Sequence, residues 1–260
     1  MEEAMDAFSK LVGLMDQLRG ENGCEWDRKQ TVDSFKTFLL EEVYEVIDAI
    51  ETSDYTALRE ELGDLLFHIV FIARICKEEG RFDIQEVISN IYNKMLYRHP
   101  HVFSRDPSDT RTVEVRWEEL KRNEKEAYTP VSGLPKSLPA LLRAYLISKR
   151  AAKVGFDWEN ITDVYDKMHE ELEELKNAVT SKNNAAIQEE IGDLLFAIVN
   201  ISRFYHTDPE DALRRTNEKF IRRFNHIEKN LGAELTSQDP SLDKMEQLWI
   251  EAKNMEKKGV

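Results

Sequence analysis

Two stretches of the chain place acidic side chains at fixed spacing among apolar residues. The first runs from Leu39 to Phe67 and contains an E-E-x-x-E motif, followed about sixteen residues later by E-x-x-D. On a helical wheel of about 100° per residue, these acids fall inside or beside the apolar surface. Carboxylates that are clustered and buried without partners repel one another and take up protons. A bound divalent cation removes this penalty, so the pattern predicts a metal site.

The alternative is a solvated face on which the acids form salt bridges, as most glutamate-rich helix surfaces do. Basic partners are scarce here, because Arg59 and Arg74 are the only lysines or arginines from Phe38 to Arg74. Ligands that are all oxygen suit Mg²⁺, Mn²⁺ or Ca²⁺. A di-iron bundle needs Glu-x-x-His motifs, and an EF-hand needs an acidic loop that contains glycine. Neither pattern surrounds these acids, so we expect hard cations held by helices.

The whole arrangement occurs twice in the chain. The segment EELGDLLFHIVFIAR (Glu60 to Arg74) recurs as EEIGDLLFAIVNISR (Glu189 to Arg203), displaced by 129 residues. The acids upstream of it keep the same displacement, whereas His68 is replaced by Ala197. We therefore interpret His68 as a packing residue or a polar residue of the acidic slot. The candidate metal-binding carboxylates are Glu41, Glu42, Glu45, Glu61 and Asp64 in the first copy, and Glu170, Glu171, Glu174, Glu190 and Asp193 in the second.

The elements that must position these acids are helices. Apolar residues recur at a spacing of three to four along both stretches, and we find no convincing alternating strand. Ser53 or Asp54 can cap the second helix of the first copy, and Asn183 or Asn184 can cap its counterpart. The segment YTPVSGLPKSLP is the best linker candidate because it contains three prolines and a glycine. We expect an all-α protein with domains at 1–127 and 140–260, joined by a linker at 128–139.

Composition excludes some classes of partner. The formal net charge is −14, which disfavours general binding to nucleic acid or to an anionic membrane. It is compatible with an anionic substrate, because a metal ion can bridge carboxylates to phosphates. The two cysteines, Cys24 and Cys76, do not form a metal-ligand spacing. No apolar run is long enough to span a membrane and no secretory signal is apparent, so we expect a cytoplasmic location.

The doubled acidic pattern running into GDLLF, together with RHPHVF, VGFDW and NEKFIRRF, resembles the MazG family of nucleoside triphosphate pyrophosphohydrolases. The resemblance covers essentially the whole chain, as two MazG-like copies in tandem. It implies an all-α fold with a four-helix-bundle-like core, and a homodimer. It also implies hydrolysis of nucleoside triphosphates to monophosphate and pyrophosphate with Mg²⁺, for which Mn²⁺ can substitute.

The resemblance also implies roles for individual residues. The acids named above would be the catalytic and metal-binding carboxylates, apart from Glu170, which would only assist with the metal. Basic residues would contact the phosphates, and two tryptophans would line the nucleotide site. The ordinary alternatives are that the basic residues are surface charges and that the tryptophans belong to the core. These substrate-binding candidates are Lys94, Arg98, Trp117 and Lys121, then Lys219, Arg223, Trp249 and Lys253.

The chemistry expected from this set is attack of a metal-activated water on the α-phosphorus, with a neighbouring carboxylate helping to remove the proton. The chain has no GxxxxGK[ST] or GxGxxG motif, so metal and side chains must hold the phosphates. Two alternatives stay open at this point. One is a related all-α hydrolase, similar to dimeric dUTPases or to phosphoribosyl-ATP pyrophosphatases. The other is a helical scaffold for dimerisation that has no enzymatic activity.

Overall fold

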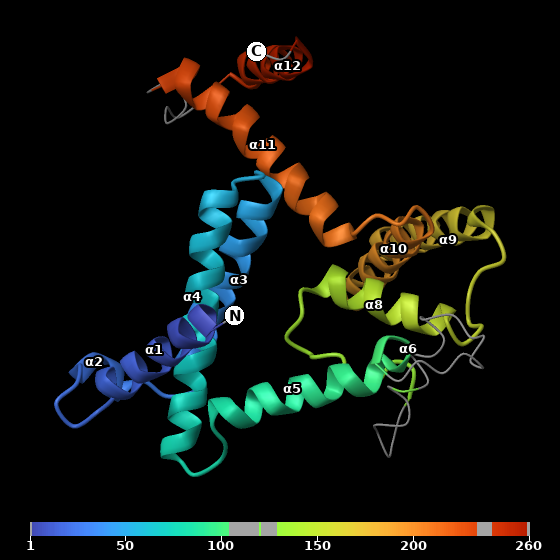
Figure 1. The fold of residues 1–260 in the computed structure, drawn as a ribbon. Coiled ribbons are helices and arrows are strands. Elements are labelled where there is room, and N and C mark those ends of the chain that lie inside the picture. Colours follow the sequence, from blue (N-terminus) through green and yellow to red (C-terminus); the bar gives the residue numbers. More distant parts are fainter. Residues whose placement is uncertain (1, 104–119, 121–128, 233–240, 259–260) are drawn as a thin grey trace. The chain divides into compact units, whose positions relative to one another are not determined.

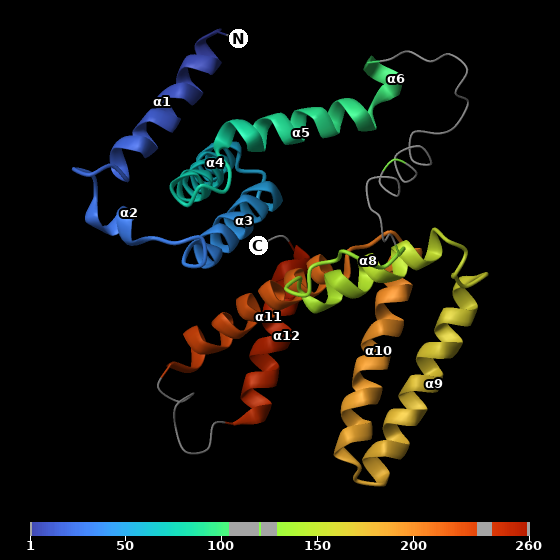
Figure 2. The same ribbon diagram turned by 90° about the horizontal axis from the view of Figure 1, so that it is seen from below.

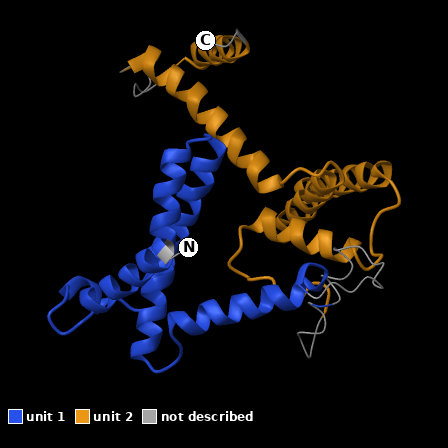
Figure 3. Ribbon diagram, in the orientation of Figure 1, with its two compact units in different colours: residues 1–126 blue, residues 127–260 orange. Residues whose placement is uncertain are grey.

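A computed structural model describes residues 2–103, 120, 129–232 and 241–258, and every regular element within them is an α-helix. The all-α fold predicted from periodicity is therefore confirmed. The chain forms two compact units, Met1–Glu126 and Ala127–Val260 (Figure 3). This division does not test the predicted domain limits at 1–127 and 140–260 or the predicted linker at 128–139, which stay predictions. In the described part of the chain, no helix has the length and apolar character needed to cross a membrane.

The first unit is built around a helical hairpin (Figure 1). Its helices are α1 (Glu2–Leu18), α2 (Glu25–Lys29), α3 (Phe35–Glu51), α4 (Tyr55–Glu78), α5 (Ile84–Arg98) and α6 (Pro100–Phe103). Helices α3 and α4 pack against each other, and α1 packs on α4. Asp54 caps α4, because its side chain accepts hydrogen bonds from the backbone N–H groups of Thr56 (2.9 Å) and Ala57 (3.0 Å). Of the two caps predicted, Asp54 is thus the one used, and Ser53 turns the chain at φ 56°.

The second unit repeats this construction. Its helices are α8 (Ala140–Ala152), α9 (Ile161–Thr180), α10 (Asn184–Phe204), α11 (Pro209–Leu231) and α12 (Leu242–Lys258). Helices α9 and α10 lie side by side, and α8 packs on α10 near the end where α10 finishes (Figure 2). Asn183 caps α10 by accepting from the backbone N–H of Ala186 at 3.3 Å, and Lys182 turns the chain at φ 54°. Both hairpins therefore use the same three-residue break.

Each hairpin buries one face and leaves the other accessible to solvent. In the first unit the core consists of Met15 from α1, Phe35 from α3, and Val70, Phe71 and Ile75 from α4. The opposite face of that hairpin keeps large apolar side chains accessible to solvent. In the first unit these side chains include Leu40, Val43, Ile50, Leu62, Leu66 and Ile69. In the second unit the exposed apolar side chains of the hairpin include Leu172, Val179, Ile191, Leu195 and Ile198. Exposed apolar side chains that gather on one face are a common feature of surfaces at which proteins associate.

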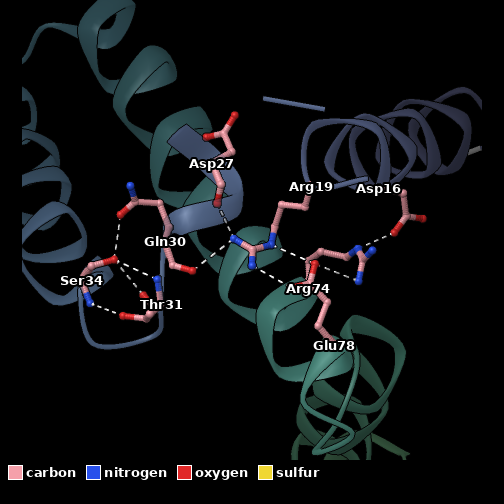
Figure 4. Close-up of polar contacts among 8 residues, drawn as sticks. All are labelled: Asp16, Arg19, Asp27, Gln30, Thr31, Ser34, Arg74 and Glu78. Atoms are coloured by element: carbon pink, nitrogen blue, oxygen red, sulfur yellow. Dashed lines mark hydrogen bonds and ion pairs between the residues drawn. The ribbon is translucent and has the colours of Figure 1, made fainter. Parts of the chain in front are cut away.

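Charged side chains hold α1 and α4 together at the end of the hairpin (Figure 4). Arg19 donates to both carboxylate oxygens of Glu78, at 2.9 and 2.7 Å, and to the carbonyl of Asp27 at 2.5 Å. Arg74 lies 2.7 Å from Asp16 and 3.2 Å from Glu78. The side chain of Arg19 is only 5% exposed, so its charge depends on these partners. The hydrogen bond from Arg19 is the main reason why the pKa of Glu78 lies below its usual value.

Glu78→Gln is expected to destabilise the first unit by about 1–3 kcal/mol at pH 7, because Arg19 loses its carboxylate partner. A carboxyl group whose pKa is lowered on folding stabilises the fold above its unfolded pKa, and this contribution disappears as pH falls through the folded pKa. The difference from the wild type should therefore shrink in acid. Hydrogen exchange of the α1 amides measures it. Glu79→Gln, which removes only the exposed pair with Arg81, is the control, and an equal effect of both variants would contradict the assignment.

Candidate active site

Three glutamates meet on the hairpin of the first unit. Glu42 and Glu45 lie one turn apart on α3, and Glu61 faces them from α4. One carboxylate oxygen from each can be chosen so that all three lie within 4.8 Å of one another. This is a spacing at which one ion can be shared. The three-residue break between the helices fixes the register that brings Glu61 opposite the pair on α3.

The electrostatics of this cluster fit a cation. Within the described residues, Glu42 Oε2 is buried and has no hydrogen-bond partner. Burial raises the pKa of Glu42, and the charges of Asp64, Glu45, Glu61 and Glu41 raise it further. Burial also raises the pKa of Glu61, followed by the charge of Glu45. A positive charge bound at the cluster would stabilise the ionised carboxylates against both effects, as a divalent cation does at a metal site.

The second unit forms the equivalent cluster from Glu171 and Glu174 on α9 and Glu190 on α10. Glu171 is buried, at 5% exposure. Desolvation raises the pKa of Glu190, and so do the charges of Glu174, Glu171 and Asp193. Clusters with the same membership thus occur in both units, at positions related by the 129-residue displacement.

A lysine distinguishes the second cluster. Lys167 Nζ lies 2.8 Å from Glu171 Oε1 and 2.9 Å from Glu170 Oε1, and these hydrogen bonds raise the pKa of Lys167. The sequence interpretation missed this residue, although Lys167 and Glu171 have the i, i+4 spacing of a helical ion pair. The scarcity of cations argued for the first copy therefore does not extend to the second.

The remaining predicted acids lie beside the clusters rather than in them. Asp64 and Asp193 are exposed, and their charges raise the pKa of Glu42 and of Glu190. Glu41 is exposed on α3, and Glu170 faces Lys167. His68 is buried against the Phe35 ring at 5.2 Å between centroids, and burial lowers its pKa. His68 therefore packs among the aromatic rings, and the charges of Asp64 and Glu41 also act on it, so both sides of its interpretation have support.

The predicted basic residues of the first unit do not lie on the hairpin. Lys94 is exposed and Arg98 is half-buried, and both are on α5. This helix starts beside the end of α4 and extends away from it (Figure 1), whereas Glu61 is near the start of α4. Trp117 and Lys121 lie outside the described residues.

The substrate-binding candidates of the second unit gather on α11 and α12. Arg223 donates to Glu256 at 2.9 and 2.7 Å and lies over the Trp249 ring at 5.4 Å. The hydrogen bond from Arg223 is the main reason why the pKa of Glu256 is lowered, and Lys219 adds to the effect. Lys253 is exposed on the same helix as Trp249. The structure thus groups these residues with one another and with Glu256, which was not predicted.

A pocket of about 510 Å³ opens beside the second cluster, within the size range of small-molecule sites. Its walls come from α8, from the connection after α8 where Gly155 turns the chain at φ 88°, and from α9 and α10. Glu171 and Asp193 are at its polar side. Its aromatic walls are Phe156, Trp158 and Phe196, and its buried polar groups include Ser148 and Asn200. The substrate-binding candidates on α11 and α12 are not among its lining residues.

Comparison with known proteins decides the family. The MazG nucleotide pyrophosphohydrolase domain matches the chain twice, over residues 30–103 and 160–228. The chain belongs to the MazG family. A nucleoside triphosphate pyrophosphohydrolase of Escherichia coli K12 is 44% identical, covering 97% of this chain and 99% of its own length. A nucleoside triphosphate pyrophosphohydrolase/pyrophosphatase MazG of Thermotoga maritima is 42% identical, and the match covers 97% of this chain and 98% of the length of that protein. An uncharacterized Bacillus subtilis protein, YabN, is 44% identical, and the match covers 97% of this chain and 53% of the length of YabN.

The two MazG repeats hold both glutamate clusters, so the resemblance inferred from the doubled acidic motif is confirmed. Parts of the pocket lie outside the repeats. Ser148 on α8 and the segment from Gly155 to Trp158 precede residue 160, where the second match begins. The pocket of the second MazG repeat is therefore completed by residues that flank the repeat itself.

Proposed function

We propose that the protein is a nucleoside triphosphate pyrophosphohydrolase, which converts a nucleoside triphosphate and water to a monophosphate and pyrophosphate. The observation that carries the proposal is a buried, partnerless carboxylate oxygen on Glu42 inside a three-glutamate cluster that the second unit repeats. The names of the relatives from Escherichia coli and Thermotoga maritima support the choice of reaction. The expected place of action is the cytoplasm, in clearing or adjusting nucleotide pools.

The metal we propose is Mg²⁺, with Mn²⁺ as a substitute. Carboxylate oxygens are the ligands that these hard cations prefer, and the ligand groups contain no sulfur or imidazole. Glu42, Glu45 and Glu61 would hold the ion in the first unit. Their counterparts would hold it in the second, with Asp64 or Asp193 and Glu41 or Glu170 beside them. When bound, the ion would neutralise the triphosphate and make water more acidic.

The protein's own side chains would accept the proton from the attacking water and stabilise the charge on the phosphate oxygens. A carboxylate beside the ion accepts the proton from the water that attacks the α-phosphorus. Lysine and arginine side chains stabilise the charge that develops on the phosphate oxygens as pyrophosphate leaves. Lys167 is placed for this role at the second cluster, since it already lies 2.8 Å from Glu171 and also lines the pocket. Its release from Glu171 on metal binding would free it for a phosphate.

The other cations would be supplied by a second copy of the chain. The predicted phosphate contacts Lys219, Arg223 and Lys253, with Trp249, lie on α11 and α12 and do not line the pocket. Lys94 and Arg98, on α5, would serve in the same way. The exposed apolar faces of both hairpins support association as a homodimer. Light scattering should give about twice the chain mass of 30.4 kDa, and a monomer at micromolar concentration would contradict this part of the proposal.

Product analysis over a panel of nucleotides tests the reaction itself. Monophosphate and pyrophosphate should appear in equal amounts from several nucleoside triphosphates when Mg²⁺ is present. Hydrolysis restricted to dUTP or to phosphoribosyl-ATP would favour the related all-α hydrolases instead. Absence of any phosphate product from the panel would favour a dimerisation scaffold. With a net charge of −14, the protein is not expected to bind nucleic acid directly.

A further inference from the structure

One carboxylate on α12 holds an arginine of α11 that is predicted to contact phosphate. Glu256 Oε2 accepts two hydrogen bonds from Arg223, one from Nε at 2.9 Å and one from Nη2 at 2.7 Å. The other oxygen, Oε1, lies 3.8 Å from Nε of Arg222. The side chain of Arg223 is 14% exposed, whereas that of Arg222 is 62% exposed. Of these two neighbouring arginines, Arg223 is therefore the one that Glu256 fixes in place.

An aromatic ring of α12 holds the same arginine. Cζ of Arg223 lies over the Trp249 ring, 5.4 Å from its centroid. Phe220, one turn before Arg223 on α11, meets this ring at 5.1 Å between centroids. A cation at this distance from the face of an indole is attracted by the ring. Trp249 and Glu256 are seven residues apart, so they lie on one face of α12 and hold Arg223 together.

The pairing with Glu256 leaves one edge of the guanidinium group available. Arginine has five N–H groups arranged as a planar fork. Glu256 takes the Nε–H and one Nη2–H of Arg223, and among the described residues no other acceptor is hydrogen-bonded to this side chain. The Nη1–Nη2 edge can therefore donate two parallel hydrogen bonds to a phosphate, which is the bidentate contact that arginine favours. Glu256 thus supports the arginine without competing for that edge.

The charges around Glu256 suit an anionic ligand. The hydrogen bond from Arg223 is the main cause that lowers the pKa of Glu256, and the charges of Arg222 and Lys219 lower it further. Glu256 is therefore ionised at neutral pH. Three cationic side chains around one carboxylate leave an excess of positive charge, although the whole chain has a net charge of −14. Such a local excess attracts an anionic substrate.

Fastening α11 to α12 is the ordinary role for such an ion pair. The side chain of Glu256 is 31% exposed, and ion pairs that are open to solvent contribute little to stability. A second carboxylate of α12 also faces α11, because Glu251 lies 3.8 Å from Nε2 of His226. The two glutamates therefore allow a comparison between a link that includes Arg223 and a link that does not.

We propose that Glu256 is a positioning residue, which holds Arg223 against Trp249 so that the free Nη1–Nη2 edge of the guanidinium group meets a phosphate of the substrate. This inference rests on the proposed pyrophosphohydrolase activity and on Arg223 as a phosphate contact. An arginine side chain without partners samples many rotamers, and fixing it before the substrate arrives removes that entropic cost from binding. Loss of Glu256 should therefore affect the same step as loss of Arg223, to a smaller extent.

A double-mutant cycle tests the proposal through the kinetics of pyrophosphate release, with Mg²⁺ and the nucleoside triphosphate that the wild type hydrolyses fastest. Arg223→Ala should lower kcat/KM at least about tenfold, and Glu256→Ala at least about fivefold. The double variant should lie within about twofold of Arg223→Ala, because Glu256 acts through that arginine. Glu256→Gln should lose less than Glu256→Ala, since the amide oxygen can still accept both hydrogen bonds.

Glu251→Gln is the matched control, because Glu251 also faces α11 but pairs with His226 rather than with Arg223. Its kcat/KM should stay within about twofold of the wild-type value. Hydrogen exchange of the α12 amides reports on the packing of the helices, and it should be the same in Glu256→Ala as in the wild type. Faster exchange in Glu256→Ala would show that the glutamate fastens the helices, and it would overturn the proposal.

The cycle also separates this inference from the function on which it rests. Losses that multiply in the double variant would mean that Glu256 acts independently of Arg223, and would reject the positioning role. An unchanged kcat/KM in Glu256→Ala or in Arg223→Ala would reject it as well, while the proposed function stands. If the wild type releases no pyrophosphate from any nucleoside triphosphate, the proposed function fails and the inference fails with it.

Discussion

The double substitution Glu42→Gln with Glu171→Gln should lower pyrophosphate release from nucleoside triphosphates at least about 100-fold at saturating Mg²⁺. Each change replaces a carboxylate ligand by an amide of the same shape, so the ion loses both charge and a strong ligand in each unit. Loss of one preorganised electrostatic contact in an active site typically costs two to three orders of magnitude in rate. The two single variants, measured alongside, assign the loss to one unit or the other.

Stability distinguishes a chemical effect from a structural one. A carboxyl group with a raised pKa in the folded state destabilises the fold when it ionises, and this penalty is present at pH 7 and vanishes in acid. Because burial raises the pKa of Glu42, Glu42→Gln should leave the metal-free protein as stable as the wild type or more so. The control pair is Glu60→Gln with Glu189→Gln, which are exposed neighbours outside the clusters. Equal activity in the two double variants would contradict the assignment of the site.

Removal of divalent metal should abolish hydrolysis. The clustered glutamates and the substrate triphosphate are both anionic, and without an ion they repel each other at short range. Dialysis against EDTA should therefore reduce the rate at least about 100-fold, and Mg²⁺ or Mn²⁺ should restore it. The matched control is EDTA that has already been saturated with Mg²⁺. Turnover that persists in metal-depleted buffer would require a different mechanism.

The helices, their caps and the acidic clusters could be predicted because they depend on local spacing. Glu42 and Glu45 are one turn apart on one helix. The caps, Asp54 and Asn183, are each one of the two candidates predicted at a polar break. The repeat then predicts the second cluster from the first. These features need only the helical period and a short connection.

The pocket could not be predicted, because it depends on contacts between distant segments. Asn200 meets Ser148 only because α8 packs on α10, and no local pattern in the sequence predicts that contact. In the first unit, the stacking of Phe35 on Phe71 likewise joins residues from two different helices. Lys167 is different, because its i, i+4 spacing to Glu171 is readable in the sequence and was overlooked. The predicted cations on α11 and α12 stay a prediction, since their place at the substrate depends on a second copy.

Direct titration with Mn²⁺, followed by electron paramagnetic resonance of the free ion, tests the metal assignment without any substrate. The wild-type chain should bind at least two ions, one per glutamate cluster. Glu42→Gln and Glu171→Gln should each remove or strongly weaken binding in one unit, and the double variant in both. Excess Mg²⁺ should displace the bound Mn²⁺. Undiminished Mn²⁺ binding in the double variant, or none in the wild type, would contradict the view that these acids are held together for a cation.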